Sequence, residues 1–196
     1  MSPEADKITN SLTHQLTKSP NNRITASPEG AAQYTMIEIE RKFLVDTTKW
    51  EKPTQGCYFQ QGYLSENGCT LRVRIAQDKA YLTIKGKTIG FSRAEFEYEI
   101  PVDDARALMQ MSLYPPIEKI RYCVEVGGKI WEVDEFLGAH KGLVLAEIEL
   151  QSEDETFEMP IWVEKEVTGD ARYYNSSLSK QIKSNVSARW AQKQIK

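Results

Sequence analysis

The chain of 196 residues is 40% hydrophobic and 27% charged, and its formal net charge is −3. This length allows one domain with a sizeable core, and the acidic balance argues against nucleic acid as a partner, which would call for overall positive charge. No apolar segment approaches the ~18 residues of a membrane-spanning helix, so a membrane is not expected as a partner either.

Residues 1–35 differ in composition from the rest of the chain. They are rich in Ser, Thr, Asn, Pro and Ala and lack apolar periodicity, which is typical of a disordered extension or a leader. They contain no hydrophobic core of a secretory signal. We therefore expect one folded domain over residues 36–183 and a C-terminal tail or helix over residues 184–196.

From Met36 onward, apolar and polar residues alternate with the period of two that is typical of β-strands. Turn signals such as Glu66-Asn67-Gly68 and Gly127-Gly128 separate many of these segments. The expected strands cover residues 36–45, 57–64, 69–77, 80–86, 93–100, 118–127, 129–136 and 143–151.

Helices are expected in only a few places. Asp103 to Met111 has helical periodicity, with Asp103 or Asp104 as its N-cap. The chain is expected to turn helical again around Tyr173 to Ile182 and near Trp190. Together these elements predict a mainly β fold of the α+β kind, an eight-stranded antiparallel β-barrel or a strongly curled sheet, with flanking helices.

Charged side chains alternate along most of the expected strands. Because residues i and i+2 of a strand share a face, the charges gather on one side and apolar residues on the other. The cations on this face are Lys42, Arg72, Arg74, Lys85, Lys119 and Arg121. The carboxylates are Glu38, Glu40, Glu95, Glu97, Glu132, Asp134, Glu147 and Glu149. Glu99 is expected to be an exposed strand end.

For any one strand, the simplest interpretation is the wet face of an antiparallel sheet that packs its other face on a core. The signs, however, are segregated by strand, whereas a solubilising surface mixes them. If the sheet closes with the charges inside, they need an ionic ligand. Arginine and lysine suit phosphate oxygens, and carboxylates suit divalent cations that bridge to phosphate. The pattern indicates a site for a metal-chelated di- or triphosphate.

Histidine and cysteine usage limits the kind of metal. With only His14 and His140, carboxylates would have to hold a metal, which favours Mg2+ or Mn2+. Cys57, Cys69 and Cys123 form no CxxC pair, so neither a zinc ribbon nor a disulfide framework is expected, and a reducing cytoplasm fits.

The segment Glu38-Ile39-Glu40-Arg41-Lys42 has the ExExK form that marks the CYTH superfamily, the triphosphate tunnel metalloenzymes. The chain resembles this family from Met36 to about Ser179 and is most similar in pattern to bacterial inorganic triphosphatases. The further matching segments are residues 61–64, 71–74, 83–85, 95–97, 118–122, 131–136, 146–150 and 166–173. The resemblance implies an eight-stranded antiparallel tunnel, open at both ends, that hydrolyses a triphosphate with the help of a metal.

The resemblance also implies roles for individual residues. Phosphate would be held by Arg72, Arg74, Lys85, Lys119 and Arg121, with Arg172 as a further contact from the closing segment. The metal side would consist of Glu38, Glu40, Asp134, Glu147 and Glu149, joined by Glu95 and Glu97. Lys42 resembles the lysine that the family places near the scissile phosphate.

Tyr63 is the second candidate catalytic residue. It shares a strand face with Gln61 and is expected to meet Lys42 across the tunnel. Beside an ammonium a phenol loses its proton more readily, so a Lys42–Tyr63 pair would position or activate water. An aromatic packing role at a barrel mouth is the alternative.

Three functions stay open at this point. The first is an inorganic triphosphatase that acts on tripolyphosphate. The second is a class IV adenylate cyclase or a thiamine triphosphatase, the latter with Trp50, Trp131 or Trp162 as an aromatic platform. The third is a non-enzymatic polyphosphate-binding module, against which the carboxylates argue. The sequence leaves the oligomeric state, including a homodimer, undecided.

Overall fold

The computed structural model describes residues 24–26, 32–34, 37–65, 67–87, 89 and 92–182. The principal elements lie within two residues of the expected ones, and the mainly β fold of the α+β kind is confirmed. They are β3 (Ile37–Val45), β4 (Cys57–Ser65), β5 (Thr70–Ala76), β6 (Lys79–Lys85), β7 (Ser92–Ile100), α2 (Val102–Gln110), β8 (Ile117–Val126), β9 (Lys129–Phe136) and β10 (Val144–Glu149).

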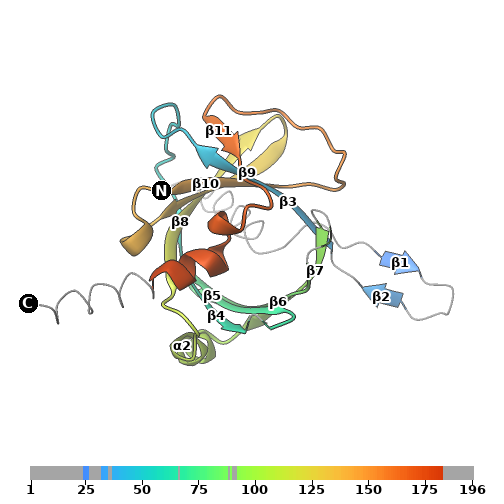
Figure 1. Ribbon diagram of the computed structural model, residues 1–196, viewed down its shortest axis with the longest axis vertical. Helices are drawn as coiled ribbons and strands as arrows, with labels where there is room; N and C mark the ends of the chain where they lie inside the picture. The colour runs from blue at the N-terminus through green and yellow to red at the C-terminus, as the bar shows by residue number, and fades with distance from the viewer. Residues whose placement is uncertain are drawn as a thin grey trace, which may run out of the picture.

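The strands β3 to β10 form a closed barrel (Figure 1). Neighbouring strands follow the order β10, β9, β8, β4, β5, β6, β7, β3, and every pairing is antiparallel. The pairing of β3 with β10, which places Lys42 opposite Glu147, closes the ring. The predicted eight-stranded antiparallel barrel is therefore confirmed for the described residues.

The strand β3 has different neighbours along its two edges. One edge pairs with β10 over residues 40–44. The other edge pairs with β7 only over residues 37–39 and then with a short strand, β11 (Val163–Glu166), over residues 43–45. The sequence analysis did not predict β11, because a four-residue segment with three charged residues has little strand propensity of its own and depends on its partner strand.

Two further short strands, β1 (Ile24–Ala26) and β2 (Ala32–Tyr34), pair with each other in a separate ribbon that was not predicted. The rest of the expected extension over residues 1–35 lies mostly outside the described residues. The same holds for the expected tail over residues 184–196 and the helix near Trp190, and these expectations stay predictions.

Helix α2 lies against the outer wall of the barrel (Figure 1). Its buried residues Ala105 and Met109 pack with Val73 of β5 and Ala80 of β6. The predicted aspartate N-cap is wrong, because the cap residue is Pro101, which makes no side-chain cap hydrogen bond. Asp103 and Asp104 lie in the first turn, where their negative charges interact favourably with the positive end of the helix dipole.

A large hydrophobic core lies on the outer face of β3, β9 and β10. Trp131 is fully buried there, with its ring 5.5 Å from that of Trp162 and 5.4 Å from that of Phe43. Trp50 packs against the same cluster beside Tyr122. The three tryptophans named as a platform therefore belong to the outer core and do not line the interior.

The C-terminal helical segment covers one end of the barrel. A 3₁₀ turn (Ala171–Tyr173) leads into a helix over residues 175–182, as predicted, and Figure 1 shows this segment lying across the barrel. Leu178 of the helix packs with Ile117, Phe136 and Leu145. The helix thus makes an apolar contact with β8, β9 and β10 at this end of the barrel. The expectation of a tunnel open at both ends stays a prediction. No helix in the described part of the chain has the length and apolar character needed to cross a bilayer.

Candidate functional site

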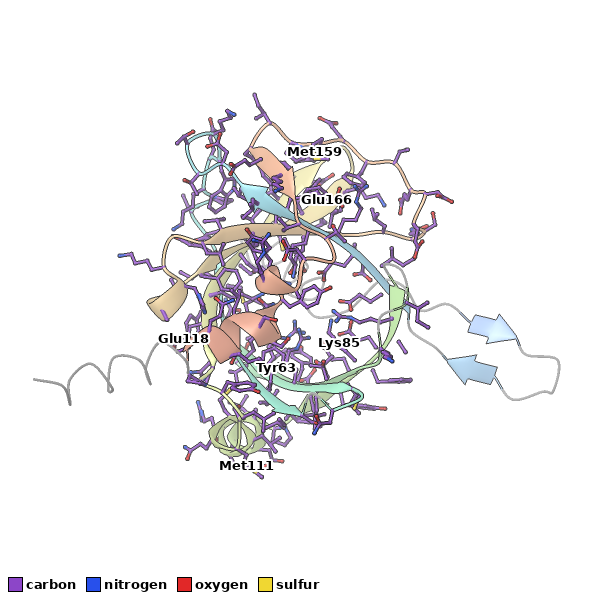
Figure 2. The ribbon with its side chains drawn as sticks, in the orientation of Figure 1. Tyr63, Lys85, Met111, Glu118, Met159 and Glu166 are labelled. Atoms are coloured by element: carbon purple, nitrogen blue, oxygen red, sulfur yellow. The ribbon has the colours of Figure 1, made fainter. Side chains whose placement is uncertain are left out.

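Alternate residues of the barrel strands point to the interior, as the pleat of a strand requires. Figure 2 shows Tyr63 of β4 and Lys85 of β6 directed toward the middle of the barrel. The structure gathers most of the predicted site residues on this inner face, where they are largely buried and the charged ones are tied to one another by ion pairs. They are Glu38, Glu40, Lys42, Tyr63, Arg72, Arg74, Lys85, Glu95, Glu97, Lys119, Arg121, Asp134 and Glu147.

One half of the inner face, formed by β8, β9, β10 and the middle of β3, holds three cations and four carboxylates, and we call it the acidic half. Its charged residues are Lys42, Lys119, Arg121, Glu40, Glu132, Asp134 and Glu147. Arg121 lies at its centre: its Nη2 is 2.6 Å from Asp134 and 2.9 Å from Glu147, and its Nη1 pairs with Glu132. One guanidinium thus holds carboxylates from two neighbouring strands.

Lys42 connects this half to the strand that opens the barrel. Its Nζ lies 2.8 Å from Glu147 and 3.6 Å from Glu40. Burial lowers the pKa of Lys42, but Glu147 and Glu40 outweigh that effect and raise it, so the ammonium stays charged. Lys42 therefore presents a fixed positive charge inside the barrel.

Lys119 is held differently. It pairs with Asp134, and its Nζ lies 5.8 Å from the ring centre of Phe59 and 5.9 Å from that of Phe136. Burial, reinforced by the nearby Arg121, lowers the pKa of Lys119 to about 8 against the opposing effect of Asp134. An additional negative group beside Lys119 would keep it protonated.

The other half, formed by β5, β6, β7 and the start of β3, holds four cations and three carboxylates, and we call it the basic half. Its charged residues are Arg72, Arg74, Lys85, Arg93, Glu38, Glu95 and Glu97. Arg74 Nη2 donates to both oxygens of Glu97 at 3.0 Å, and Arg72 lies 3.5 Å from the same carboxylate. Thr83, fully buried on β6, donates its hydroxyl to Glu97 at 2.8 Å. Glu97 thus orients two arginines.

Glu38 lies at the seam where β3 meets β7. Lys85 Nζ and Arg93 Nε each lie 2.7 Å from it, and Lys85 also lies 3.0 Å from Glu95. Burial alone would raise the pKa of Glu38, but Lys85 and Arg93 together hold it well below its usual range. Glu38 is therefore a stable carboxylate with two cationic partners.

Glu40 of the acidic half is less well neutralised than Glu147, because its ion pair with Lys42 is 3.6 Å long whereas that of Glu147 is 2.8 Å. Burial raises its pKa to about 7, the neighbouring carboxylates of Glu147 and Glu38 add to that rise, and Lys42 offsets it only in part. A carboxylate in this situation is stabilised by any additional cation that approaches it. Glu40, with Glu147 close by, therefore marks a position suited to a cation.

The residues present fit a hard divalent cation. Within the described ranges, no three metal-binding side chains are grouped as a ready-made site, because most carboxylates are paired with lysine or arginine. The donors available are carboxylate oxygens, which suit Mg2+, Mn2+ or Ca2+ rather than a soft metal. Glu40 and Glu147 repel each other, and a shared divalent cation would relieve this repulsion.

Several buried polar atoms on the inner face have no hydrogen-bond partner within the described structure. They are Gln61 Oε1, Arg72 Nε, Arg74 Nε and the hydroxyl of Tyr81. Buried polar atoms normally bond to protein, ligand or water, so these atoms mark a surface suited to a polar ligand. Tyr81 pairs in register with Arg74, whose guanidinium lies 5.3 Å from the centre of its ring.

Tyr63 does not match the expectation of an easily deprotonated phenol. Burial raises the pKa of Tyr63 to about 12, which outweighs the opposing effects of Arg72 and Lys42. Its hydroxyl accepts a hydrogen bond of 3.0 Å from the Gln61 amide, whereas Lys42 pairs with carboxylates. Tyr63 is therefore a protonated donor at neutral pH.

A spectroscopic titration tests this property of Tyr63. The tyrosinate absorbance of the wild type and of Tyr63→Phe should rise equally as the pH passes the ordinary tyrosine pKa of 10.0. The two should differ by one tyrosine only as the pH approaches about 12, because burial penalises the charged phenolate. Circular dichroism follows the fold throughout, and a one-tyrosine difference already present below pH 10 would contradict the assignment.

Two residues singled out in the sequence, Arg172 and Glu99, lie on the exposed surface away from this network. Arg172 lies in the closing 3₁₀ turn with 75% of its side chain exposed, and it pairs with Asp170. Glu149 lies on β10 in register with Glu40, at the margin of the acidic half. Glu99 is 60% exposed beside Lys79, which confirms an exposed strand end.

The sequence analysis missed Arg93 and Thr83 as members of the network. Arg93 precedes Glu95 by two residues, so the same alternation of strand faces would have placed it inside. Thr83 precedes Lys85 by two residues and therefore shares its face, but an uncharged hydroxyl gives no sign of its partners in the sequence.

The comparisons with known proteins agree with this architecture. The CYTH domain family matches residues 36–183. An inorganic triphosphatase of Acetivibrio thermocellus is 48% identical over 145 residues, covering 73% of this chain and 93% of the relative. An inorganic triphosphatase of Nitrosomonas europaea is 36% identical over 152 residues, covering 75% of this chain and 99% of the relative.

A solved structure supports the same assignment. The crystal structure of an inorganic triphosphatase superimposes with a TM-score of 0.55 at 34% identity, covering 72% of this chain and 93% of that one. Enzymes with the triphosphate tunnel fold are generally metal-dependent. The barrel, the paired charges of its interior and these similarities lead to one conclusion: the chain belongs to the CYTH domain family.

Proposed function

We propose that this protein is a metal-dependent triphosphatase that hydrolyses inorganic tripolyphosphate. The observation that carries the proposal is a closed barrel whose interior divides into a half with excess cations and a half with excess carboxylates. A polyanion fits the first half, and a metal chelated to that polyanion fits the second. The two relatives and the solved structure that bear the name inorganic triphosphatase support the same reaction.

The cations of the basic half are proposed to bind the phosphates, together with Lys119 and Arg121. Arginine forks bind phosphate oxygens in bidentate fashion, and the unpartnered Nε atoms of Arg72 and Arg74 add donors for this purpose. Glu95 and Glu97 were expected on the metal side, but their contacts with Arg72, Arg74 and Lys85 favour a role in orienting these cations. Arg172 remains a proposed phosphate contact from the closing turn.

Glu40, Glu147 and Glu149 are proposed to hold Mg2+ or Mn2+, with Glu38 and Asp134 joining them once their cationic partners turn to the phosphates. When bound, the metal neutralises charge on the phosphate oxygens. The raised pKa of Glu40 and its proximity to Glu147 favour a metal at this position rather than in the basic half.

The reaction proposed is an in-line attack of water on a terminal phosphorus. A bond forms between the water oxygen and phosphorus, the bridging phosphorus–oxygen bond breaks, pyrophosphate leaves with the electron pair, and a proton passes to solvent. Lys42, which keeps its charge, stabilises the negative charge that develops near the scissile bond. Tyr63, which keeps its proton, orients water or phosphate through its hydrogen bonds and does not act as a base.

A phosphate-release panel tests this function. Tripolyphosphate, ATP, thiamine triphosphate and pyrophosphate are offered with Mg2+ or Mn2+, with and without a chelator. We expect tripolyphosphate to be strongly preferred and the chelator to abolish turnover, because the carboxylates need a metal to interact with phosphate. Lys42→Ala, purified in the same way, serves as the control for contaminating phosphatases.

The other functions are outcomes that would overturn the proposal. Cyclic AMP formed from ATP would assign a cyclase, and preference for the thiamine ester would assign a thiamine triphosphatase. The latter would need a platform other than Trp50, Trp131 and Trp162, which lie in the outer core. Tight binding of tripolyphosphate without turnover would assign a binding module.

A cytoplasmic location forms part of the proposal. Cys57, Cys69 and Cys123 are all free thiols, which is typical of proteins in reducing compartments.

A further inference from the structure

The main chain of Lys42 forms a hydrogen bond with a side chain. At the same place, most other barrel residues bond to the main chain of a neighbouring strand. Lys42 lies between the part of β3 that pairs with β7 and the part that pairs with β11. Its N–H donates to the hydroxyl of Thr168 at 2.9 Å, and its carbonyl accepts from the Val167 N–H at 2.8 Å. The segment after β11 thus completes the edge of β3 at the residue that carries the ammonium.

The hydroxyl of Thr168 makes two short hydrogen bonds in opposite senses, and it also lies 3.4 Å from the Lys42 carbonyl. It accepts from the Lys42 N–H and donates to Glu166 Oε1 at 2.7 Å. Glu166 in turn accepts hydrogen bonds from two nitrogens of the Arg41 guanidinium. Nε donates to Oε1 at 2.8 Å, and Nη2 donates to Oε2. Because a hydroxyl has only one proton, the bond to Glu166 leaves a lone pair of Thr168 directed at Lys42.

Arg41 has a defined place on the outer face of β3. Its guanidinium carbon lies 5.1 Å from the ring centre of Phe157 and 5.7 Å from that of Phe43, both in or against the outer core. The chain of contacts from the outer core through Arg41, Glu166 and Thr168 therefore ends on the backbone of Lys42. These contacts link a packed apolar cluster to the backbone position that sets where the Lys42 ammonium lies along the barrel.

The chain turns away directly after this contact. Gly169 has φ of +76°, a conformation that a side chain would strain, and the 3₁₀ turn and the covering helix follow. No further residue of a regular strand is therefore in place to take over the contact from Thr168.

We propose that Thr168 is a positioning residue for Lys42. Its hydroxyl fixes the Lys42 main chain in the gap between β7 and β11, so that Nζ stays within reach of Glu147 and of the scissile phosphate. The effect on turnover rests on the proposed function, whereas the effect on the Lys42 backbone does not. The proposed phosphate-binding cations of the barrel wall lie on β5, β6, β7 and β8, away from Thr168.

Three variants separate this role from a merely structural one. Thr168→Val keeps the shape and removes both hydrogen bonds, and Thr168→Ser keeps the hydroxyl. Thr48→Val is the matched control, because the Thr48 hydroxyl bonds only to Asp46 in an exposed turn among the described contacts. Each variant is measured for kcat and KM with tripolyphosphate, for melting temperature, and for amide exchange at Lys42.

We expect Thr168→Val to lower kcat about ten- to a hundredfold with little change in KM, because a small displacement of a catalytic group is costly. Exchange of the Lys42 amide proton should accelerate about tenfold, since its only described acceptor is lost. Thr168→Ser should restore both quantities to nearly the wild-type values, and Thr48→Val should change neither.

Two outcomes would overturn the proposal. One is an unchanged exchange rate at Lys42 in Thr168→Val, which shows that the hydroxyl does not hold the backbone. The other is accelerated amide exchange at Lys42 without the expected selective loss of kcat. That would be the case if kcat were unchanged, or if kcat and KM changed together while the melting temperature fell. A wild type that does not hydrolyse tripolyphosphate would contradict the proposed function alone, and the exchange experiment would still decide whether Thr168 holds Lys42.

Discussion

Lys42→Ala should lower kcat for tripolyphosphate about 10²- to 10³-fold, the loss typical when one preorganised group that stabilises developing charge is removed. The ammonium is buried, retains its proton and lies 2.8 Å from Glu147. Water cannot reproduce its fixed charge inside the barrel. KM should change much less, because the arginines and lysines of the other strands still hold the phosphates.

The control for Lys42→Ala is Lys49→Ala. Lys49 is 56% exposed and pairs only with Asp46 at the surface among the described contacts, so its removal should leave kcat within about twofold, as expected for exposed ion pairs. Steady-state kinetics with both variants, together with melting curves that show an intact fold, make the comparison. Unchanged turnover in Lys42→Ala would exclude the proposed mechanism.

Arg121→Ala should cost about 3–5 kcal/mol of folding free energy, the range measured when one partner of a buried ion pair is removed. Arg121 is buried and contacts Asp134 and Glu147, which are themselves almost wholly buried. Without the guanidinium, the carboxylates of Glu132, Asp134 and Glu147 all lose this partner, and only the lysines remain to neutralise them. Denaturant unfolding measures the loss.

A double-mutant cycle identifies the source of that cost. Adding Asp134→Asn to Arg121→Ala removes one of the stranded carboxylates, so the double variant should be more stable than the sum of the two single changes predicts. Arg106→Ala is the surface control: this arginine is 68% exposed beside Asp103, and its loss should cost at most about 0.5 kcal/mol. Additive effects of Arg121→Ala and Asp134→Asn would refute the account of the acidic half as a coupled network.

The amino-acid pattern accounts for the strands because the local signal is strong. Segments such as Leu71-Arg72-Val73-Arg74 alternate so regularly that both the strand and its inward face follow from period two. The same argument fails for β11, which is short, charged and extended only because β3 offers it an edge. It also fails for the helix cap, since Pro101 begins α2 through its restricted backbone and not through a side-chain bond.

The pairing of charges was only partly accessible from the sequence. Alternation placed Glu95 and Glu97 inside the barrel, and the structure adds that Glu97 binds two arginines and Thr83. Nothing in the sequence distinguishes a carboxylate that orients arginines from one that is free to hold a metal. That difference depends on which strands become neighbours when the sheet closes.

The sequence by itself determined a mainly β barrel, an interior lined by charge, and a metal-chelated triphosphate as the expected ligand. These conclusions depend on local periodicity and on residue type, which act over a few neighbouring residues. Only the tertiary structure decided that Tyr63 keeps its proton, that Glu40 lacks full neutralisation, that a helix covers one end, and that Thr168 holds Lys42. Each of these depends on burial and on contacts between residues far apart in the chain, which set local electrostatics and backbone position only after folding.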